Sequence, residues 1–462
     1  MSAPLFSKKT RVHFVGVGGI GMSGIAEVLL NLGYPVSGSD LKTTPTTDAL
    51  RELGASIFEG HRVDNVRGAD VVVISSAVRE NNPEVTEAAR LQVPIIPRAE
   101  MLAELMRMKY GVAVAGSHGK TTTTSMIAVM LDRAGLDPTM VIGGRIAALG
   151  GNAKLGHSDL MVVEADESDR SFLQLSPVLA VVTGIDREHM EAYRDVSDLE
   201  NAFVDFVNKV PFYGASVLCL DEERVQTILP RVRRRYVTYG FSPQADISAE
   251  GVRLEGATSR FHLKIAGEPA GEVTLRTPGR VSVLNSLAAI GIGRELGLSV
   301  DDIRSGLESF SGVDRRFQVK ADAGGVVVVD DYGHHPTEIR ATLATAKDAF
   351  GRRTVVIFQP HRYSRVSALF DEFCRAFHQA DVLVVTEIYP AGEDPVPGIS
   401  GEKLAEGIQV HGHRHVRFVA ELDDVPGAIE DELVDGDLVI TLGAGSVTAL
   451  SDKLAEVVRE RA

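Results

Sequence analysis

The chain has 462 residues, which is too long for one hydrophobic core of ordinary size and indicates two to four domains. Its net charge of −15 argues against broad binding to nucleic acid or to anionic membranes. No apolar run reaches the roughly 18 residues of a membrane span. Cys219 and Cys374 are the only cysteines, so we expect neither a disulfide framework nor a zinc site. With no signal-peptide pattern at the N-terminus, the sequence predicts a cytoplasmic location.

The first part of the chain alternates strand and helix patterns. Apolar runs predict strands at residues 11–17, 34–40, 56–60 and 69–78. Helical spacing predicts helices at residues 20–33, 46–54, 83–91 and 98–108. This alternation is typical of βαβ units with a parallel sheet, so we expect an α/β domain over residues 1–108.

Two further α/β domains are predicted over residues 109–312 and 313–462. In the central one, residues 246–277 alternate polar and apolar side chains, which indicates antiparallel strands. The other elements of the central domain are strands at 109–116, 159–168 and 177–185 and helices at 120–135, 281–297 and 299–310. Residues 311–317 form a linker pattern. Strands of the last domain are predicted at 326–333, 353–360, 380–390, 415–420 and 437–445.

The strongest local signal is a glycine turn between a predicted strand and helix, VAVAGSHGKTTTT. Gly116 and Gly119 let backbone N–H groups close around phosphate oxygens, Lys120 would reach the β- and γ-phosphates, and Thr121 would ligate Mg²⁺. Val114 stands where the full G-x-x-x-x-G-K-[ST] pattern has its first glycine, so the chain carries the shorter G-x-x-G-K-T form. The strand context favours an Mg-ATP site over an ordinary glycine turn. The predicted loop comprises Gly116, Ser117, His118, Gly119, Lys120, Thr121 and Thr122.

Polar residues follow the next two predicted strands of this domain. Glu164 and Asp166 end one strand, and His189 lies just beyond the other. The carboxyl ends of parallel strands are where ligands gather in open α/β sheets. Carboxylates and a neutral imidazole there could hold one or two Mg²⁺ ions.

A second glycine turn, residues 16–21, matches G-x-G-x-x-G after a strand and before a helix. Asp40 follows where a ribose-binding acid would stand in a dinucleotide site. The physical requirement is only that a pyrophosphate fits at the helix N-terminus, so a nucleotide-sugar diphosphate satisfies it as well as NAD does. A packing turn without ligand is the third reading.

Three clusters in the last domain remain: DDYGHHP at 330–336, FQPHRYSR at 358–365 and LGAGS at 442–446. Two arginines three residues apart can share a helical face and clamp a carboxylate. Each arginine alone is more often a surface ion pair, and the glycine turn is as often a plain strand-to-helix connection. The middle cluster offers His361, Arg362 and Arg365.

Taken together, these motifs resemble those of the Mur ligases, in the same order and over essentially the whole chain. They are GVGGIGMSGIA, GSHGKTTT, EADESD, DREHM, DDYGHHPTE, FQPHRYSR and LGAGS. The resemblance implies a Rossmann-like N-terminal domain for a UDP-sugar, a central P-loop ATPase domain with a mixed sheet, and a C-terminal Rossmann-like domain. It also implies ATP and Mg²⁺, with UDP-N-acetylmuramate and L-alanine as small-molecule substrates of a monomer or homodimer. ATP would phosphorylate the lactyl carboxylate, and the alanine amine would attack the acyl phosphate in peptidoglycan synthesis.

The resemblance also implies roles for individual residues. Thr121 and Glu164 would ligate one Mg²⁺ and His189 a second, Asn285 would contact adenine, and Asn152 would lie near the γ-phosphate. Residues implied in catalysis are Lys120, Glu164, His189, Arg316, Asp331, His361, Arg362 and Arg365; of these, Arg316 and Asp331 would also reach the nucleotide. The UDP portion would be held by Gly18, Gly19, Ile20, Gly21, Met22, Ser23, Asp40, Ser75 and Ser76. Tyr332 with His334 or His335 would face the alanine.

The chain departs from the family pattern at two places. Val281 and Ser282 replace the usual His and Asn of G-R-H-N-x-x-N, which puts one adenine-side contact in doubt. Some relatives carry a carbamylated lysine downstream of the metal-binding His. The nearest candidate here, Lys209, comes later, so we expect no such group.

Three alternatives remain at this stage. A recycling ligase would attach a tripeptide to the same UDP-sugar, and QPHRYSR favours alanine over it. An NAD-dependent oxidoreductase has no use for Lys120 and Thr121. A non-catalytic nucleotide-binding regulator has little reason to keep the catalytic side chains together.

Overall fold

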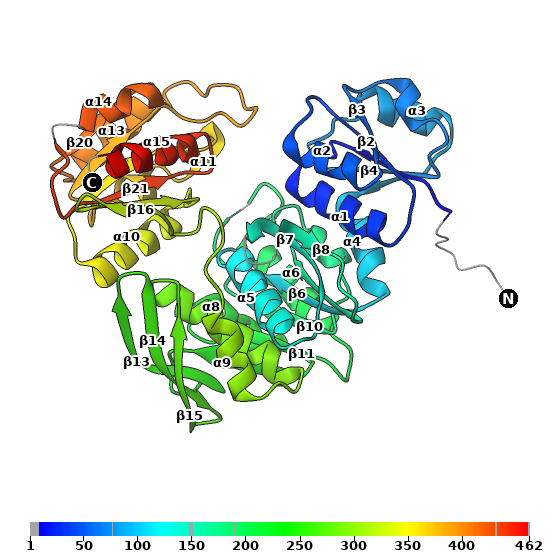
Figure 1. Ribbon diagram of the computed structural model, residues 1–462, viewed down its shortest axis with the longest axis horizontal. Helices are drawn as coiled ribbons and strands as arrows, with labels where there is room; N and C mark the ends of the chain where they lie inside the picture. Colours follow the sequence, from blue (N-terminus) through cyan, green and yellow to red (C-terminus); the bar gives the residue numbers. More distant parts are fainter. Residues whose placement is uncertain (1–8, 76, 147–150, 189, 430–431, 461–462) are drawn as a thin grey trace. The chain divides into compact units, whose positions relative to one another are not determined.

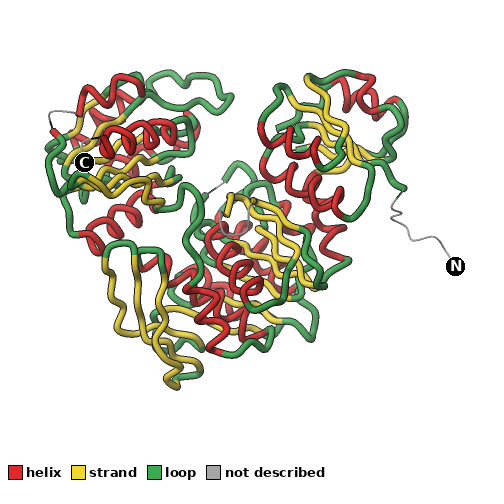
Figure 2. Tube along the Cα trace, in the orientation of Figure 1, coloured by secondary structure: helices red, strands yellow, loops and turns green. Residues whose placement is uncertain are grey.

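The computed structural model describes residues 9–75, 77–146, 151–188, 190–429 and 432–460. The chain divides into two compact units. Unit 1 comprises residues 1–250, 263–271 and 284–310, and unit 2 comprises residues 251–262, 272–283 and 311–462. Three sheets with flanking helices confirm the predicted α/β class (Figures 1 and 2). No described helix has the length and apolar character needed to cross a membrane.

The N-terminal sheet is parallel, in the order β3-β2-β1-β4-β5. Its strands are β1 Val12–Val15, β2 Val36–Asp40, β3 Ser56–Glu59, β4 Val71–Ile74 and β5 Ile95–Pro97. The helices are α1 Ile20–Asn31, α2 Pro45–Glu52, η1 Val63–Val66, α3 Pro83–Arg90 and α4 Arg98–Arg107. The buried β1 supplies the middle strand, so the glycine turn that follows it opens at the carboxyl edge of the sheet.

The central sheet has ten strands in the order β15-β14-β13-β12-β11-β10-β6-β9-β7-β8. Its first strands are β6 Tyr110–Ala115, β7 Thr139–Ile146, β8 Gly151–Lys154, β9 Leu160–Glu164 and β10 Leu179–Val182. The others are β11 Ala215–Cys219, β12 Tyr236–Gly240, β13 Ile247–Glu255, β14 Thr258–Ile265 and β15 Glu268–Leu275. Two-residue connections join β13, β14 and β15, which makes them the predicted antiparallel hairpins. Helical segments are α5 Lys120–Arg133, η3 Ser171–Gln174, α6 Val196–Asn208, α7 Glu223–Ile228, η4 Leu229–Arg231, α8 Arg280–Glu295 and α9 Val300–Glu308.

The third sheet lies in unit 2, in the order β16-β17-β21-β18-β19-β20. Its strands are β16 Gln318–Ala323, β17 Val326–Asp331, β18 Thr354–Phe358, β19 Val382–Val385, β20 Val416–Phe418 and β21 Leu438–Leu442. All pairs are parallel except β16 with β17. The helices are α10 Pro336–Phe350, α11 Tyr363–Ala368, α12 Phe370–Cys374, α13 Gly401–Val410, η5 Leu422–Asp424, α14 Val425–Ile429 and α15 Val447–Glu460.

Within unit 1, the N-terminal and central sheets share one hydrophobic core. Helix α1 packs against β7 and β8, and a Cβ atom added at Gly24 would lie 3.0 Å from the Cβ of Ala153. Met22 and Ile25 of α1 belong to the same buried cluster as Val141 of β7. The close contact at Gly24 fixes α1, and with it the glycine turn at its start, against the central sheet.

Candidate functional site

The phosphate loop follows β6 and turns on two glycines in the left-handed region of backbone space. Gly116 has φ +133° and Gly119 has φ +81°, which favour glycine strongly. A Cβ atom at Gly116 would lie 2.1 Å from Thr183 Oγ1, and one at Gly119 would lie 2.6 Å from Asn285 Oδ1. The buried Asn285, predicted to contact adenine, is therefore packed against the loop.

Lys120 begins helix α5 and is held on the loop itself. Its ammonium donates to Gly116 O at 2.6 Å and pairs with Glu167 Oε1 at 2.7 Å. Burial alone would lower the pKa of Lys120, but the carboxylates of Glu167 and Glu164 raise it above its usual value. Burial also raises the pKa of Glu167, with Asp166 adding to the rise against the pull of Lys120. Lys120 is thus a charged donor held at the phosphate loop.

Glu167 is a functional candidate that the sequence analysis missed. It lies in EADESD, three residues after Glu164, and its side chain is almost fully buried. Pattern reasoning selected the carboxylates nearest the strand end. The only signal for Glu167 is its ion pair with Lys120, 47 residues away in the chain.

Thr121 and Glu164 form a pair of oxygen ligands at the loop. Thr121 Oγ1 donates to Glu164 Oε1 at 3.0 Å, and the backbone N–H of Gly143 donates to Glu164 Oε2 at 2.8 Å. A hydroxyl and a carboxylate fixed together are the hard donors that Mg²⁺ takes. The residues present therefore fit a magnesium ion.

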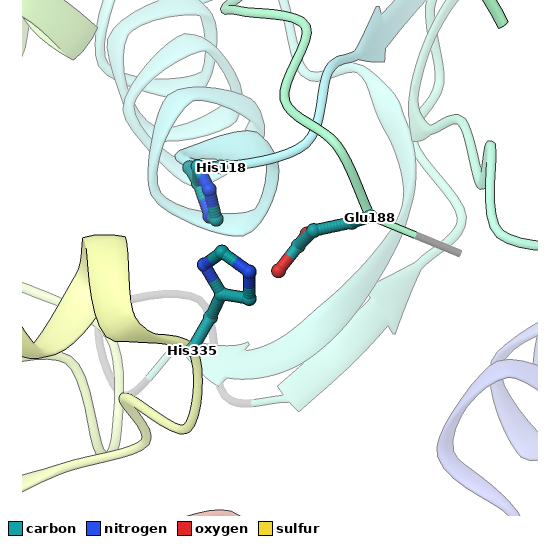
Figure 3. Close-up of side chains that lie close together, drawn as sticks. All are labelled: His118, Glu188 and His335. Atoms are coloured by element: carbon teal, nitrogen blue, oxygen red, sulfur yellow. The ribbon is translucent and has the colours of Figure 1, made fainter. Parts of the chain in front are cut away.

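The loop after β10 anchors the other side of the phosphate loop. Asp186 N donates to Ser117 Oγ at 2.7 Å, and Asp186 Oδ2 lies 3.1 Å from His118 Nε2. Figure 3 shows His118 beside the start of α5 and Glu188 on the neighbouring loop; their ligand atoms lie within 4.8 Å of each other. His189, predicted to ligate a second Mg²⁺, lies outside the described residues.

The N-terminal glycine turn is braced by backbone contacts. Asp40 Oδ2 accepts a hydrogen bond from Gly18 N at 2.8 Å, and Asp40 Oδ1 accepts one from Leu41 N at 2.7 Å. Gly19 caps α1 with no side-chain hydrogen bond. Asp40 thus holds the turn in shape, whatever ligand the turn binds.

The two turns of unit 1 border one cavity of about 330 Å³. Its lining includes Gly16, Gly19, Gly21 and Ser75 from the N-terminal sheet region, and Lys120 and Glu164 from the phosphate loop region.

Other predicted residues lie close to this cavity or apart from it. Met22 also lines the cavity, and Ser23 is buried in α1. Thr122 is half-buried in the first turn of α5. Asn152 on β8 is directed toward Gly24, with Nδ2 3.5 Å from a Cβ added there. Ser76 and the side chain of Ile20 lie outside the described residues.

At the departures from the family pattern, Val281 and Ser282 stand in the first turn of α8. Ser282 Oγ donates to Pro278 O at 2.8 Å, and Val281 is exposed. Ser282 therefore directs its hydroxyl to the residues that precede α8.

In unit 2, Asp331 is buried at the end of β17. Its carboxylate accepts from Phe317 N at 2.7 Å and from Gly333 N at 2.8 Å. Burial raises the pKa of Asp331, and Arg316 opposes the rise. The guanidinium of Arg316 lies over the Tyr332 ring at 5.0 Å and 3.7 Å from Glu338 Oε1. The structure thus gathers Arg316, Asp331 and Tyr332 at one strand end.

The histidines of unit 2 meet nearby. His334 and His361 have ring centroids 5.9 Å apart, and His361 stacks on Tyr389. Burial lowers the pKa of His334 to about 3 and that of His361 to about 4, so both are neutral at pH 7. Arg365 Nη1 donates to His361 O at 3.2 Å.

The remaining predicted residues of this region have other surroundings. His335 caps α10 and accepts from Thr337 N through Nδ1 at 3.3 Å; Figure 3 labels it as well. Arg362 is exposed, with φ +70°. Arg315, which sequence reasoning left in a linker, lies over Tyr332 at 4.8 Å and donates to Gly443 O at 2.6 Å. That contact ties the linker to the 442–446 turn.

Three sequence profiles match consecutive parts of the chain. They are described as the Mur ligase family catalytic domain over residues 11–110, the Mur ligase middle domain over 114–293, and the Mur ligase glutamate ligase domain over 315–445. A UDP-N-acetylmuramate–L-alanine ligase of Geotalea daltonii is 54% identical over 99% of this chain and 100% of its own length. The chain belongs to the Mur ligase family.

Solved structures of Mur ligases and related enzymes share the fold. The UDP-N-acetylmuramate–alanine ligase of Thermotoga maritima superposes with a TM-score of 0.83 at 32% identity, covering 98% of this chain and 100% of that one. A murein peptide ligase of Psychrobacter arcticus gives a TM-score of 0.72 at 22% identity, over 97% and 99% of the two chains, which shows a common fold.

Proposed function

We propose that this Mur ligase joins L-alanine to the lactyl carboxylate of UDP-N-acetylmuramate at the expense of ATP. The observation that carries the proposal is the cavity of unit 1, which the N-terminal glycine turn and the phosphate loop line together. A sugar nucleotide on the first turn can thereby present its carboxylate to a nucleotide on the second. Full-length identity to relatives of that name supports the same substrates over a recycling ligase.

The reaction needs activation because a free carboxylate repels nucleophiles. A carboxylate oxygen attacks the γ-phosphorus of ATP, ADP leaves, and an acyl phosphate forms. The neutral amine of alanine then adds to the carbonyl carbon, and the tetrahedral intermediate expels phosphate as the amine proton passes to solvent. Catalysis of such a transfer is largely positioning and charge stabilisation.

In this proposal, Lys120 stabilises the transferring phosphoryl group, and the loop N–H groups orient it. Thr121 and Glu164 would hold Mg²⁺, which neutralises phosphate charge when bound. The buried Asp331 and the half-buried His361 of unit 2 would serve the nucleotide and the amino acid. Division into a UDP-sugar domain (1–108), an ATP domain (109–312) and an amino-acid-side domain (313–462) is part of the proposal, as are a cytoplasmic location and a monomeric or homodimeric state.

A phosphate-release assay with mass detection tests the proposal. UDP-N-acetylmuramate, ATP and Mg²⁺ are supplied with L-alanine in one reaction and with the muropeptide tripeptide in another. We expect a product heavier by one alanine residue, with one phosphate released per product. Preference for the tripeptide would assign a recycling ligase, and no product in either reaction would contradict the ligase assignment.

Oxygen labelling tests the acyl phosphate. With ¹⁸O in the lactyl carboxylate, the mechanism transfers one labelled oxygen to the released phosphate, because the carboxylate oxygen bonded to phosphorus leaves with it. Unlabelled phosphate would contradict this route.

A further inference from the structure

The cavity between the two glycine turns is also lined by an arginine, Arg98, which has no part in the proposed mechanism. Four charged side chains of described residues line it: Arg98, Lys120, Glu164 and Asp166. Lys120 is already paired with Glu167, and Glu164 accepts from Thr121 and Gly143. Arg98 is therefore the cation in this lining whose donors are available.

Arg98 is the first residue of α4, and only 25% of its side chain is exposed. Its one ion pair is long, 3.6 Å from Nη2 to Asp166 Oδ2, and no described residue accepts a hydrogen bond from its guanidinium. A guanidinium carries five N–H donors, and those of Arg98 are not among the buried atoms without a partner, so they are open to a ligand in the cavity. The arrangement indicates a group prepared for a ligand.

Other arginines of similar burial show the contrast. Arg315, with 24% of its side chain exposed, donates to Gly443 O at 2.6 Å. Arg353, with 37% exposed, donates to Asp437 Oδ2 at 2.9 Å and to Glu432 O at 3.0 Å. Arg315 and Arg353 thus each donate to internal acceptors, although Arg315 Nε has none, whereas Arg98 donates to no described residue.

The position of Arg98 favours an anionic ligand. A Cβ atom added at Gly21 would lie only 2.8 Å from Arg98 Nη1, so the guanidinium is packed against the first turn of α1. That turn contains no acidic residue, and the partial positive charge of the helix end adds to that of the guanidinium. On its other side, Arg98 approaches Asp166, which shares the cavity with Lys120.

We propose that Arg98 binds an anionic oxygen of the sugar nucleotide, on its diphosphate or on its lactyl carboxylate. The role rests on the proposed function and adds a substrate-binding residue to it. A guanidinium suits both groups because its fork matches phosphate and carboxylate oxygens. The absence of a side chain at Gly21 leaves room for Arg98 to approach the helix end.

Steady-state kinetics of Arg98→Ala and Arg98→Lys test the role. Loss of a hydrogen-bonded charge pair should raise the KM for UDP-N-acetylmuramate about 10- to 100-fold, with the KM for ATP within about twofold of the wild type. The KM of the lysine variant should lie between those of the wild type and the alanine variant, because lysine keeps the charge but not the paired N–H donors of the guanidinium. Arg107→Ala is the matched control, because Arg107 ends the same helix, is exposed and pairs with Glu104.

Two further measurements sharpen the result. Competitive inhibition by UDP-N-acetylglucosamine, which has the diphosphate but no lactyl group, shows whether Arg98 binds the diphosphate or the lactyl carboxylate. An inhibition constant that rises with the KM assigns the diphosphate, and one that stays constant assigns the carboxylate. Gly21→Ala should also raise the KM for UDP-N-acetylmuramate, because the added methyl displaces the guanidinium, and it provides a test if Arg98→Ala fails to fold.

An unchanged KM for UDP-N-acetylmuramate in the Arg98 variants would overturn the role. So would equal rises in both KM values, which indicate that Arg98 only braces α4 against Asp166. A wild-type chain that forms no alanine product would instead refute the proposed function, so the two failures are distinguishable.

Discussion

The two glycine turns of unit 1 share a strand–turn–helix arrangement but differ in side chains and in the backbone conformation of the capping glycine, which is extended at Gly19 and left-handed at Gly119. Each follows a buried parallel strand and opens a helix whose N-cap is a glycine, Gly19 for α1 and Gly119 for α5. The first is braced by the carboxylate of Asp40 on its backbone. The second adds Lys120 and Thr121. From this comparison we expect that a glycine turn at a helix N-terminus contributes to phosphate binding at both sites, while the transfer of a phosphoryl group needs an added lysine and metal ligands.

A buried glutamate stands behind each turn, in opposite electrostatic surroundings. Glu84 accepts from Ser39 Oγ at 2.5 Å and lies 3.4 Å from His13 Nε2. Burial alone would raise the pKa of Glu84, but hydrogen bonds from His13, Ser39 and Asn65 lower it to about 2. Glu167 faces Lys120 next to further carboxylates, and its pKa is raised. The first glutamate is a structural anion, whereas the second forms an ion pair with the lysine of the phosphate loop.

The largest expected effect is at the phosphate loop. Lys120→Ala should lower kcat about 100- to 1,000-fold, because a charge contact to the transferring group is lost. The measurement is single-turnover product formation. Lys264→Ala, at an ion pair with Glu250 on the β13–β14 hairpin, is the control. Turnover near that of the wild type in Lys120→Ala would remove the lysine from the mechanism.

The glycines themselves give the next effect. Gly119→Ala meets both a left-handed φ and Asn285 Oδ1, so its KM for ATP should rise about tenfold or more. Gly16→Ala has a similar φ of +80°, but its nearest contact is Ser75 Oγ at 3.7 Å. Gly16→Ala should therefore raise chiefly the KM for the UDP-sugar, and by a smaller factor than Gly119→Ala raises the KM for ATP. Equal effects on both substrates in both variants would erase the distinction between the turns.

Asp40→Asn should have a smaller effect. The amide keeps one acceptor for Gly18 N or Leu41 N but loses the charge, so the KM for UDP-N-acetylmuramate should rise about two- to fivefold, since such hydrogen bonds contribute modestly. The KM for ATP should stay constant. A rise in the KM for ATP instead would contradict the assignment of Asp40 to the UDP-sugar turn.

Replacing Glu84 should change the stability of the fold but not catalysis, and the size of the change should depend on pH. Its folded pKa of about 2 lies below the usual 4.5, so the carboxylate contributes stability above pH 4.5 and loses it as pH falls toward 2. Thermal unfolding of the wild type and of Glu84→Gln is followed from pH 7 to pH 3. The difference between their melting temperatures should narrow as the pH falls. A difference in melting temperature that does not change with pH would contradict the link between the lowered pKa of Glu84 and stability.

Much of the fold could be read from the sequence because its signals are local. Glycine turns after apolar runs located β1, β6 and their helices, and the alternating pattern located the β13–β15 hairpins. Strands such as β8 and β16 were missed, since short edge strands carry little periodicity. Helix α6 was not predicted, although Asp195 caps it and its buried residues recur at helical spacing.

The candidate site likewise combines features that local motifs predict with features that depend on contacts between distant segments. Thr121 and Glu164, predicted as ligands of one Mg²⁺, are hydrogen-bonded to each other, whereas the packing of Asn285 against the loop was not predicted. Glu167, Arg98 and the backbone role of Asp40 depend on contacts between distant segments. A single sequence carries no sign of those contacts, because the residues are unremarkable where they stand. The roles of the individual site residues stay predictions.

Equilibrium titration tests the division between the turns most directly. The wild-type chain is titrated with UDP-N-acetylmuramate, alone and in the presence of saturating Mg²⁺ and a non-hydrolysable ATP analogue. The account predicts one site for each ligand and simultaneous occupancy, with the sugar nucleotide binding in both titrations. Mutual exclusion, with the analogue abolishing sugar-nucleotide binding, would show that both nucleotides use one turn and would contradict the account.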